Sequence, residues 1–286
     1  MQKNQILFLA AGIMLFSLLY FGGKMVGKQT TGKAPMANRD QAQGSGPMMS
    51  PMAEVEPMQI GSYLQDAKLQ LKGDALLLLK DLESKDQQAS TAVTNKDLAE
   101  FWEKQENLNA AAHFYKKAAF LENTEKSITF AGNLFLAILQ RTEKPEQRKW
   151  QALEAIACFN KALELNPSNV DSKISLATCY TDGTGETMKG VTLLREITQA
   201  DSTNVPANIT LGKLAIQSGQ FDKAVKRLEL VLSQQPKNTE AMYFLAEAFR
   251  GKGDKQKAIE LFERCKKEVK DPEFAKEIDS YINSFK

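Results

Sequence analysis

The sequence predicts an all-α protein, an array of about five helix hairpins with flanking cap helices, preceded by one transmembrane helix. Small and apolar residues recur along the chain, so that Leu211 and Ala224 return 34 residues later as Leu245 and Ala258. An uncharged run of 18 residues occupies positions 6–23. The 286 residues are 43% hydrophobic and 25% charged, which is a globular composition.

Residues 1–28 are the predicted membrane anchor. The run "ILFLAAGIMLFSLLYFGG" at residues 6–23 would be about 27 Å long as a helix, enough to cross the hydrocarbon core of a bilayer. A cleaved secretory signal is the competing interpretation, but Tyr20 and Phe21 occupy the place where small residues precede a cleavage site. We therefore expect a retained, single-pass helix.

Residues 29–57 are predicted to form a flexible linker, because they are rich in Gly, Pro, Ser, Gln and Met and show no helical apolar period. Methionine thioethers are copper ligands, and several lie in or beside the linker: Met36, Met48, Met49, Met52 and Met58. No His or Cys accompanies them, so we expect neither a metal nor another cofactor here. As a random coil the linker would reach on the order of tens of Å.

Residues 58–91 are predicted to hold a leading helix, about Gln59 to Glu83, and a connection. The apolar side of this helix has leucines near heptad spacing: Leu64, Leu71, Leu78 and Leu82. The helix would cap the array or pair with a partner. We expect the Leu-rich stretch Ala75 to Leu79 to be buried and not to form a second membrane span.

Residues 92–271 are the predicted array, and its units begin near Ala92, Glu125, Val170, Val205 and Thr239. Small residues would let the two helices of a hairpin approach, and Pro would end the second helix. One hairpin cannot bury its apolar face alone, so neighbours must stack. The stretch "QRTEKPEQRKWQ" adds about eleven residues between the helices of the second unit, and "TDGTGE" adds one residue to the third.

Residues 272–286 are the predicted C-terminal capping helix. Its apolar side carries Phe274, Ile278, Ile282 and Phe285. A terminal unit without such a helix would expose its stacking face.

These motifs resemble the tetratricopeptide repeat family over residues 92 to about 270, most strongly in the fourth and fifth units. The resemblance implies a right-handed superhelix whose first helices line a concave groove for a protein or peptide partner. It also implies the groove residues, for each of which an ordinary solvated helix position is the alternative: Asn133, Thr178, Thr181, Ile209, Lys213, Ile216, Tyr243, Glu247 and Arg250. One variant of the family grips a chaperone's C-terminal carboxylate, but Glu100 beside Lys96 would repel that group.

No motif in the sequence indicates catalysis. The sole histidine, His113, is expected to face solvent, and "DGTG" at residues 182–185 is expected to be a turn and not an aspartic-protease loop. The cysteines Cys158, Cys179 and Cys265 are expected to be free thiols in the core, with a Cys158–Cys179 bond as the alternative. We therefore expect that the protein is not an enzyme and has no catalytic residues.

Charge adds little. The net charge is +2, and beyond residue 57 the Lys and Arg residues equal the Asp and Glu residues in number, 32 of each. No basic face is indicated, so we expect no nucleic-acid partner.

The sequence thus favours a membrane-tethered scaffold for protein–protein interaction. Alternatives are a self-association module, which would make the chain a homo-oligomer, and an accessory factor of cell-envelope biogenesis such as cytochrome assembly, which rests on resemblance alone. Similar anchored repeat proteins often face outward in bacterial envelopes, so we expect the array on the outer (periplasmic) face. The lysines at 24, 28 and 33 favour the cytoplasmic face by the positive-inside rule.

Overall fold

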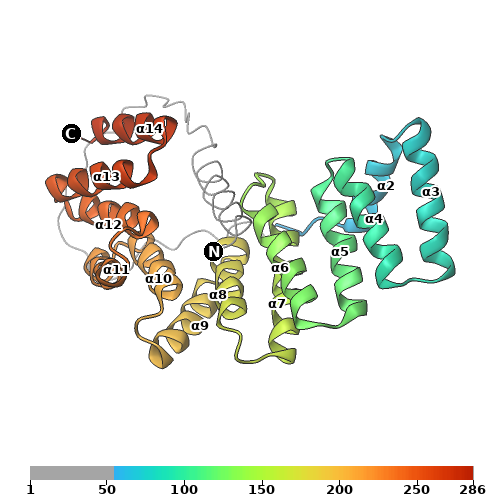
Figure 1. Cartoon of the computed structure of the whole chain (residues 1–286), viewed down its shortest axis with the longest axis horizontal. Coiled ribbons are helices and arrows are strands. Elements are labelled where there is room, and N and C mark those ends of the chain that lie inside the picture. The colour runs from blue at the N-terminus through green and yellow to red at the C-terminus, as the bar shows by residue number, and fades with distance from the viewer. Residues whose placement is uncertain (1–54, 286) are drawn as a thin grey trace, which may run out of the picture. The chain divides into compact units, whose positions relative to one another are not determined.

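The structure is a computed structural model that describes residues 55–285 (Figure 1). The predicted transmembrane helix at residues 6–23 and residues 29–54 of the linker lie outside the described residues. From residue 55 to residue 285, no helix is both long and apolar enough to cross a bilayer, and no strand occurs. Nearly all described residues belong to one compact unit, Pro57–Lys286.

The described chain consists of α-helices and one π-helix, η1. In order they are α2 (Ile60–Leu69), α3 (Gly73–Gln88), α4 (Ala92–Lys104), α5 (Leu108–Glu122), α6 (Glu125–Leu139), α7 (Pro145–Leu165), α8 (Val170–Thr178), η1 (Cys179–Thr184), α9 (Thr187–Ala200), α10 (Val205–Gln217), α11 (Phe221–Gln234), α12 (Thr239–Lys252), α13 (Lys255–Val269) and α14 (Pro272–Asn283).

The helices from α4 to α13 form five hairpins that stack in chain order (Figure 1). In each hairpin the first helix packs against the second, and the first helices α6, α8, α10 and α12 also contact one another in sequence. This confirms the predicted all-α repeat array. Each hairpin buries its apolar side against its neighbours, because no hairpin is large enough to bury it alone.

Small residues permit the close approach of the paired helices, as predicted. A Cβ atom on Gly212 of α10 would lie 3.0 Å from Cγ of Leu228 on α11. In the second hairpin, a Cβ atom on Gly132 would lie 2.9 Å from Cε1 of Phe159. Both distances are shorter than ordinary carbon contacts, so the helices are closer than a larger side chain would allow.

Asparagine side chains begin several of the repeats. Asn169, Asn204 and Asn238 stand immediately before α8, α10 and α12, and each Oδ1 accepts a hydrogen bond from the backbone N–H three residues later, at 2.8 to 3.0 Å. The first turn of a helix has backbone N–H groups without partners inside the helix, and an N-cap asparagine satisfies one of them. These caps set where each first helix starts.

The added residues of the second unit do not form a long loop, and that prediction is wrong. The connection covers only residues 140–144, and the remaining added residues extend α7, which has 21 residues. Pro145 is its first residue. Proline is favoured there, because its missing N–H would have no partner within the helix and its fixed φ already fits a helix.

The extra residue of the third unit lies in the π-helix η1, which directly continues α8. A π-helical segment takes in one additional residue without ending the helix. Gly185, with φ of 75°, ends it in the left-handed region that glycine adopts without strain. Most of the predicted turn at residues 182–185 is therefore helical.

The predicted single leading helix is two helices, α2 and α3, separated by residues 70–72. The break lets α2 fold back on α3, where Lys68 and Glu83 form an ion pair. The expectation that Ala75 to Leu79 is buried is also wrong. Only Leu79 is fully buried, whereas Leu77 and Leu78 are 65% and 51% exposed. Within residues 55–285, no repeat packs on that side of α3 to cover them.

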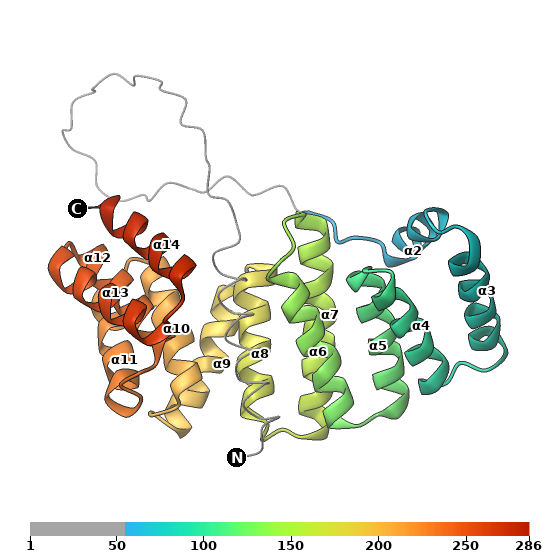
Figure 2. The same cartoon turned by 45° about the horizontal axis from the view of Figure 1, so that its top comes forward.

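The segment before α2 runs across the first two hairpins at the end where their first and second helices connect (Figure 2). The backbone N–H of Met58 donates to the carbonyl of Glu146 at 2.9 Å, and the side chains of Met58 and Ile60 pack against the core of the α6–α7 hairpin. The Tyr63 hydroxyl donates to Oδ1 of Asn107 at 2.9 Å. This segment therefore ties the N-terminal helices to the second hairpin as well as to the first.

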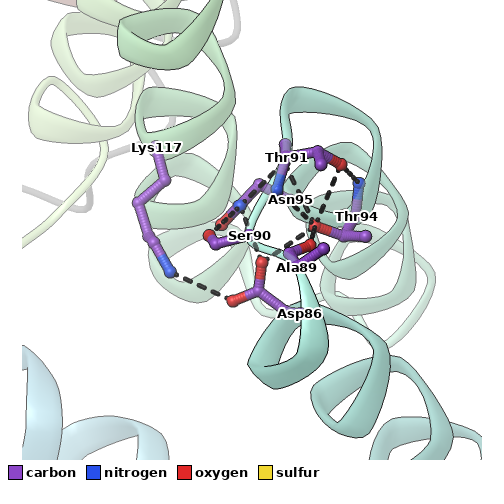
Figure 3. Close-up of polar contacts among 7 residues, drawn as sticks. All are labelled: Asp86, Ala89, Ser90, Thr91, Thr94, Asn95 and Lys117. Carbon is purple, nitrogen blue, oxygen red and sulfur yellow. Dashed lines mark hydrogen bonds and ion pairs between the residues drawn. The ribbon is translucent and has the colours of Figure 1, made fainter.

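Asp86 joins α3 to the first hairpin (Figure 3). Its carboxylate accepts hydrogen bonds from Oγ1 of Thr94 and Nδ2 of Asn95, both at 2.9 Å, and Nζ of Lys117 lies 3.4 Å away. Burial acts to raise the pKa of Asp86, but hydrogen bonds from Thr94 and Ser90 and the charge of Lys117 hold it below its ordinary value. Asn95 is fully buried, so this cluster is a structural joint.

At the other end, α14 covers the last hairpin as the predicted capping helix. Its buried side chains are Phe274, Ile278 and Ile282, and Phe285 just beyond it is half-buried. The opposite side of α14 carries exposed polar residues such as Glu273 and Asp279, as the outer face of a cap requires.

Candidate protein-binding face

The first helices α6, α8, α10 and α12, with η1, form what we call the first-helix face. All nine predicted groove residues lie on these elements. Asn133 is on α6, Thr178 ends α8, and Thr181 is in η1; Ile209, Lys213 and Ile216 are on α10, and Tyr243, Glu247 and Arg250 are on α12.

In the third repeat, both predicted threonines bond to their own helix. The Thr178 hydroxyl donates to the carbonyl of Ile174 at 3.1 Å, and that of Thr181 lies within 3.2 Å of the carbonyl of Thr178. A Cβ atom on Gly190 of α9 would lie 2.6 Å from Cγ2 of Thr181. The Thr181 side chain thus packs from η1 against α9.

Lys213 interacts with two carboxylates of neighbouring repeats. Its Nζ is 2.8 Å from Oδ2 of Asp182 in η1, and the two side chains are 27% and 26% exposed. Glu240, in the first turn of α12, is half-buried, and burial raises the pKa of its carboxyl while the charge of Lys213 opposes that rise. Three consecutive repeats therefore contribute one charge each at this place.

Sequence reasoning missed both carboxylates as residues of this face. The sequence predicts a turn at Asp182, whereas in the structure η1 continues α8 and places Asp182 on this face. Glu240 stands in the first turn of a helix, where an acidic residue is usual because it complements the helix dipole. The periodic position of Glu240 in the repeat was the signal that could have found it.

In the fifth repeat, α14 covers two of the predicted residues, Glu247 and Arg250. The Tyr281 hydroxyl donates to Oε1 of Glu247 at 2.8 Å, and Arg250 pairs with the same carboxylate at 3.0 Å. The Arg250 guanidinium also lies 5.6 Å from the centre of the Tyr281 ring. Burial, and then the bond to Glu247, raises the pKa of Tyr281. Glu247 and Arg250 are therefore engaged within the chain.

The remaining predicted residues differ in exposure. Asn133 is exposed and Ile216 is half-buried, so both are available at the surface. Ile209 is only 6% exposed and belongs to the core of α10. Tyr243 is half-buried, and its ring centre lies 5.5 Å from that of Phe262. In the first repeat, Lys96 pairs with Glu122 at 2.5 Å.

The thiols are buried, and the histidine is half-buried. Cys158, Cys179 and Cys265 are free and buried, and burial raises the pKa of the first two thiols to about 12 and of the third to about 11. His113 was expected to face solvent, but it is half-buried on α5 with its ring edge against Phe114, and burial lowers its pKa to about 4. Within residues 55–285, no group of three or more His, Cys, Asp or Glu residues is arranged to hold a metal ion.

Comparison with known families identifies the repeat. A family model described as tetratricopeptide repeat matches residues 209–270, and a second of the same description matches residues 151–169. The first match spans the fourth and fifth hairpins except residues 205–208 of α10, and the second lies within α7 and the connection after it.

Several solved structures are similar to this chain. The MamA protein has 17% identity, with 63% of this chain and 92% of that chain covered and a TM-score of 0.46. YrrB, titled a TPR protein with an unusual peptide-binding site, has 20% identity, 70% and 97% coverage and a TM-score of 0.42. A tetratricopeptide repeat protein from Parabacteroides merdae has 14% identity, 79% and 91% coverage and a TM-score of 0.49. The two family matches and the helix order identify residues 55–285 as an all-α helical solenoid that carries tetratricopeptide repeats.

Proposed function

We propose that this chain is a non-enzymatic, membrane-tethered scaffold that holds a protein or peptide partner on its first-helix face. The observation that carries the proposal is the stack of five hairpins, in which the first helices from α6 to α12 share one face of mixed polar and apolar residues. Arrays of this kind provide extended surfaces for other chains. Asn133, Lys213 and Ile216 lie on the part of that face that α14 leaves open.

Photo-crosslinking in cells tests the binding face. A photoreactive amino acid replaces Asn133 in the full chain, and a matched variant carries it at Glu229, which is exposed on the second helix α11. We expect a discrete crosslinked protein from position 133 and none from position 229. Equal crosslinking from both positions, or none from position 133 and from Ile216, would contradict the proposal.

The membrane tether rests on the uncharged run at residues 6–23. Its helix would cross a bilayer, and residues 29–54 would let the array move relative to it. We propose that the array faces outward. Protease added to intact spheroplasts should then digest an array tagged at Lys286 while the inner membrane stays closed. Protection would place the array in the cytoplasm, and release of the untruncated chain into the soluble fraction would argue against the anchor.

A second candidate function, self-association, has one specific observation in its favour. Leu69, Leu77 and Leu78 are 82%, 65% and 51% exposed at the N-terminal end of the array, which is where a preceding repeat would stack. The occupant we consider is a second copy of the same hairpin. Light scattering of residues 55–286 should show a dimer if this holds, and a monomer at high concentration excludes it.

A further inference from the structure

Three charged side chains of the first-helix face meet at the junction of the third, fourth and fifth repeats. Asp182 and Glu240 supply two carboxylates, and Lys213, which interacts with both, supplies one ammonium group. All three side chains are half-buried, so solvent screens them less than it screens fully exposed ions. The charge balance here is therefore felt by a bound chain.

The three charged groups differ in their hydrogen bonds. Lys213 is bonded to Asp182 at 2.8 Å, and the other carboxylate oxygen of Asp182 accepts from Oγ1 of Thr181 at 3.0 Å. For Glu240, by contrast, the described part of the chain provides no hydrogen-bond donor to the carboxylate, and Lys213 affects it only through its charge. Burial disfavours the charged form of a half-buried carboxylate that has no donor from the protein, and a cation from outside would favour it.

Apolar residues flank this row of charges. Ile216 follows Lys213 by three residues on α10, and Tyr243 follows Glu240 by three residues on α12, so each lies one helical turn away on the same side. Both are half-buried. A lysine or arginine side chain has a long apolar stem and a charged end, and such a side chain places its stem on apolar surface and its charge beside a carboxylate.

We propose that the first-helix face takes a lysine or arginine side chain of an extended partner segment, with the carboxylate of Glu240 as its acceptor. This inference rests on the proposed function, since it names the chemistry of the partner at the same face. A segment with an acidic residue at this point is rejected, because Asp182 and Glu240 repel it and Lys213 is already paired.

If Glu240 has only a structural role, the expected effect of its replacement is different. As an acidic residue in the first turn of α12, it stabilises that helix through the dipole alone. Replacement by glutamine would then change the stability of the protein but leave the choice among bound peptides unaltered. Selectivity is therefore the property to measure.

The test uses the full chain in nanodiscs and a phage-displayed library of random peptides. Selections are run with the wild type, with Glu240→Gln, with Lys213→Gln and with Glu229→Gln, which makes the same charge change on α11. We expect wild-type and Glu229→Gln selections to enrich peptides that carry Lys or Arg beside an apolar residue. Glu240→Gln should lose this enrichment, and Lys213→Gln should strengthen it.

A peptide recovered with the wild type should bind Glu240→Gln about tenfold more weakly by calorimetry, the effect of one lost charge contact. The same enrichment with Glu240→Gln as with the wild type, or wild-type peptides without basic residues, overturns the inference and leaves the binding face in place. If neither the wild type nor any variant enriches a peptide, the proposed function is overturned, and this inference with it.

Discussion

Arg148 on α7 donates from Nη2 to the backbone carbonyl of Asp182 at 3.0 Å, and this bond joins the second repeat to the third. Nη1 of the same guanidinium donates to the carbonyls of Leu139 and Thr142, at 2.7 and 3.0 Å. The last carbonyls of a helix have no partner within the helix, so Arg148 satisfies the final carbonyl of α6 at Leu139, together with the carbonyl of Thr142 in the connection to α7. Through its carboxylate Asp182 also reaches Lys213, so one residue of η1 links three repeats.

Arg148→Ala is expected to lower the free energy of unfolding by about 2–3 kcal/mol, because three carbonyls lose a charged donor. Arg148→Lys should recover only part of this, since an ammonium group lacks the planar fork that reaches several acceptors. Urea denaturation followed by circular dichroism measures both variants. An unfolding midpoint for Arg148→Ala equal to that of the wild type would show that these bonds contribute nothing.

Alanine substitutions at two glycines, Gly61 and Gly190, distinguish the effect of helix propensity on stability from the effect of packing. Alanine is favoured over glycine within a helix by up to about 1 kcal/mol. At Gly61, where no atom lies within 4 Å of an added Cβ, Gly61→Ala should be neutral or raise the melting temperature. At Gly190 an added Cβ would lie 2.7 Å from the backbone oxygen of Ala177, which cannot move aside. Gly190→Ala should therefore lower the melting temperature. Equal shifts in calorimetry would contradict the close approach of α8 and α9.

The repeat was readable in the sequence because its physical cause is local. Close helix packing requires small residues such as Gly212 and Ala224 at fixed places, and an apolar period of 3.6 residues marks the buried sides. The extension of α7 was not predicted, although Pro145 was a usable signal for the start of a helix. The break at residues 70–72 was missed because the leucines on both sides kept a helical period.

The charged row on the first-helix face could not be predicted in the same way. Asp182 and Lys213 are 31 positions apart, and their distance depends on how η1 continues α8 and how the third repeat stacks on the fourth. The cover on Glu247 depends on where α14 docks, because Tyr281 comes from outside the repeats. The repeat spacing predicts which side of a helix a residue occupies, but it does not predict the partner across a junction.

His113 should make stability depend on pH. Its pKa is about 4 in the folded protein, against 6.5 for an ordinary histidine, because burial and the charges of Lys117 and Lys116 outweigh the opposing charge of Glu154. Between these values the unfolded chain binds more protons, so stability rises with pH in this window and is lost as pH falls from about 6.5 toward 4. The contribution is roughly 1 to 3 kcal/mol.

The measurement compares urea midpoints of the wild type and His113→Gln from pH 4 to 7.5. His113 is the only histidine in the chain, so the difference between the two curves isolates its titration from that of the carboxylates. The wild type should lose stability faster than the variant as the pH falls. Parallel curves would mean that the imidazole stays accessible to protons in the folded state.

Loss of the C-terminal cap is expected to have a local effect. Ile278 on α14 is fully buried, and Ile278→Ala should cost about 2–4 kcal/mol in the last repeat through lost burial and the cavity left behind. In a repeat array each hairpin contacts only its neighbours, so the cost falls on the nearest units. Hydrogen exchange should speed up for amides of α12 and α13 and remain unchanged in α4 and α5. Uniform acceleration along the chain would instead mean that the whole array unfolds as one cooperative unit.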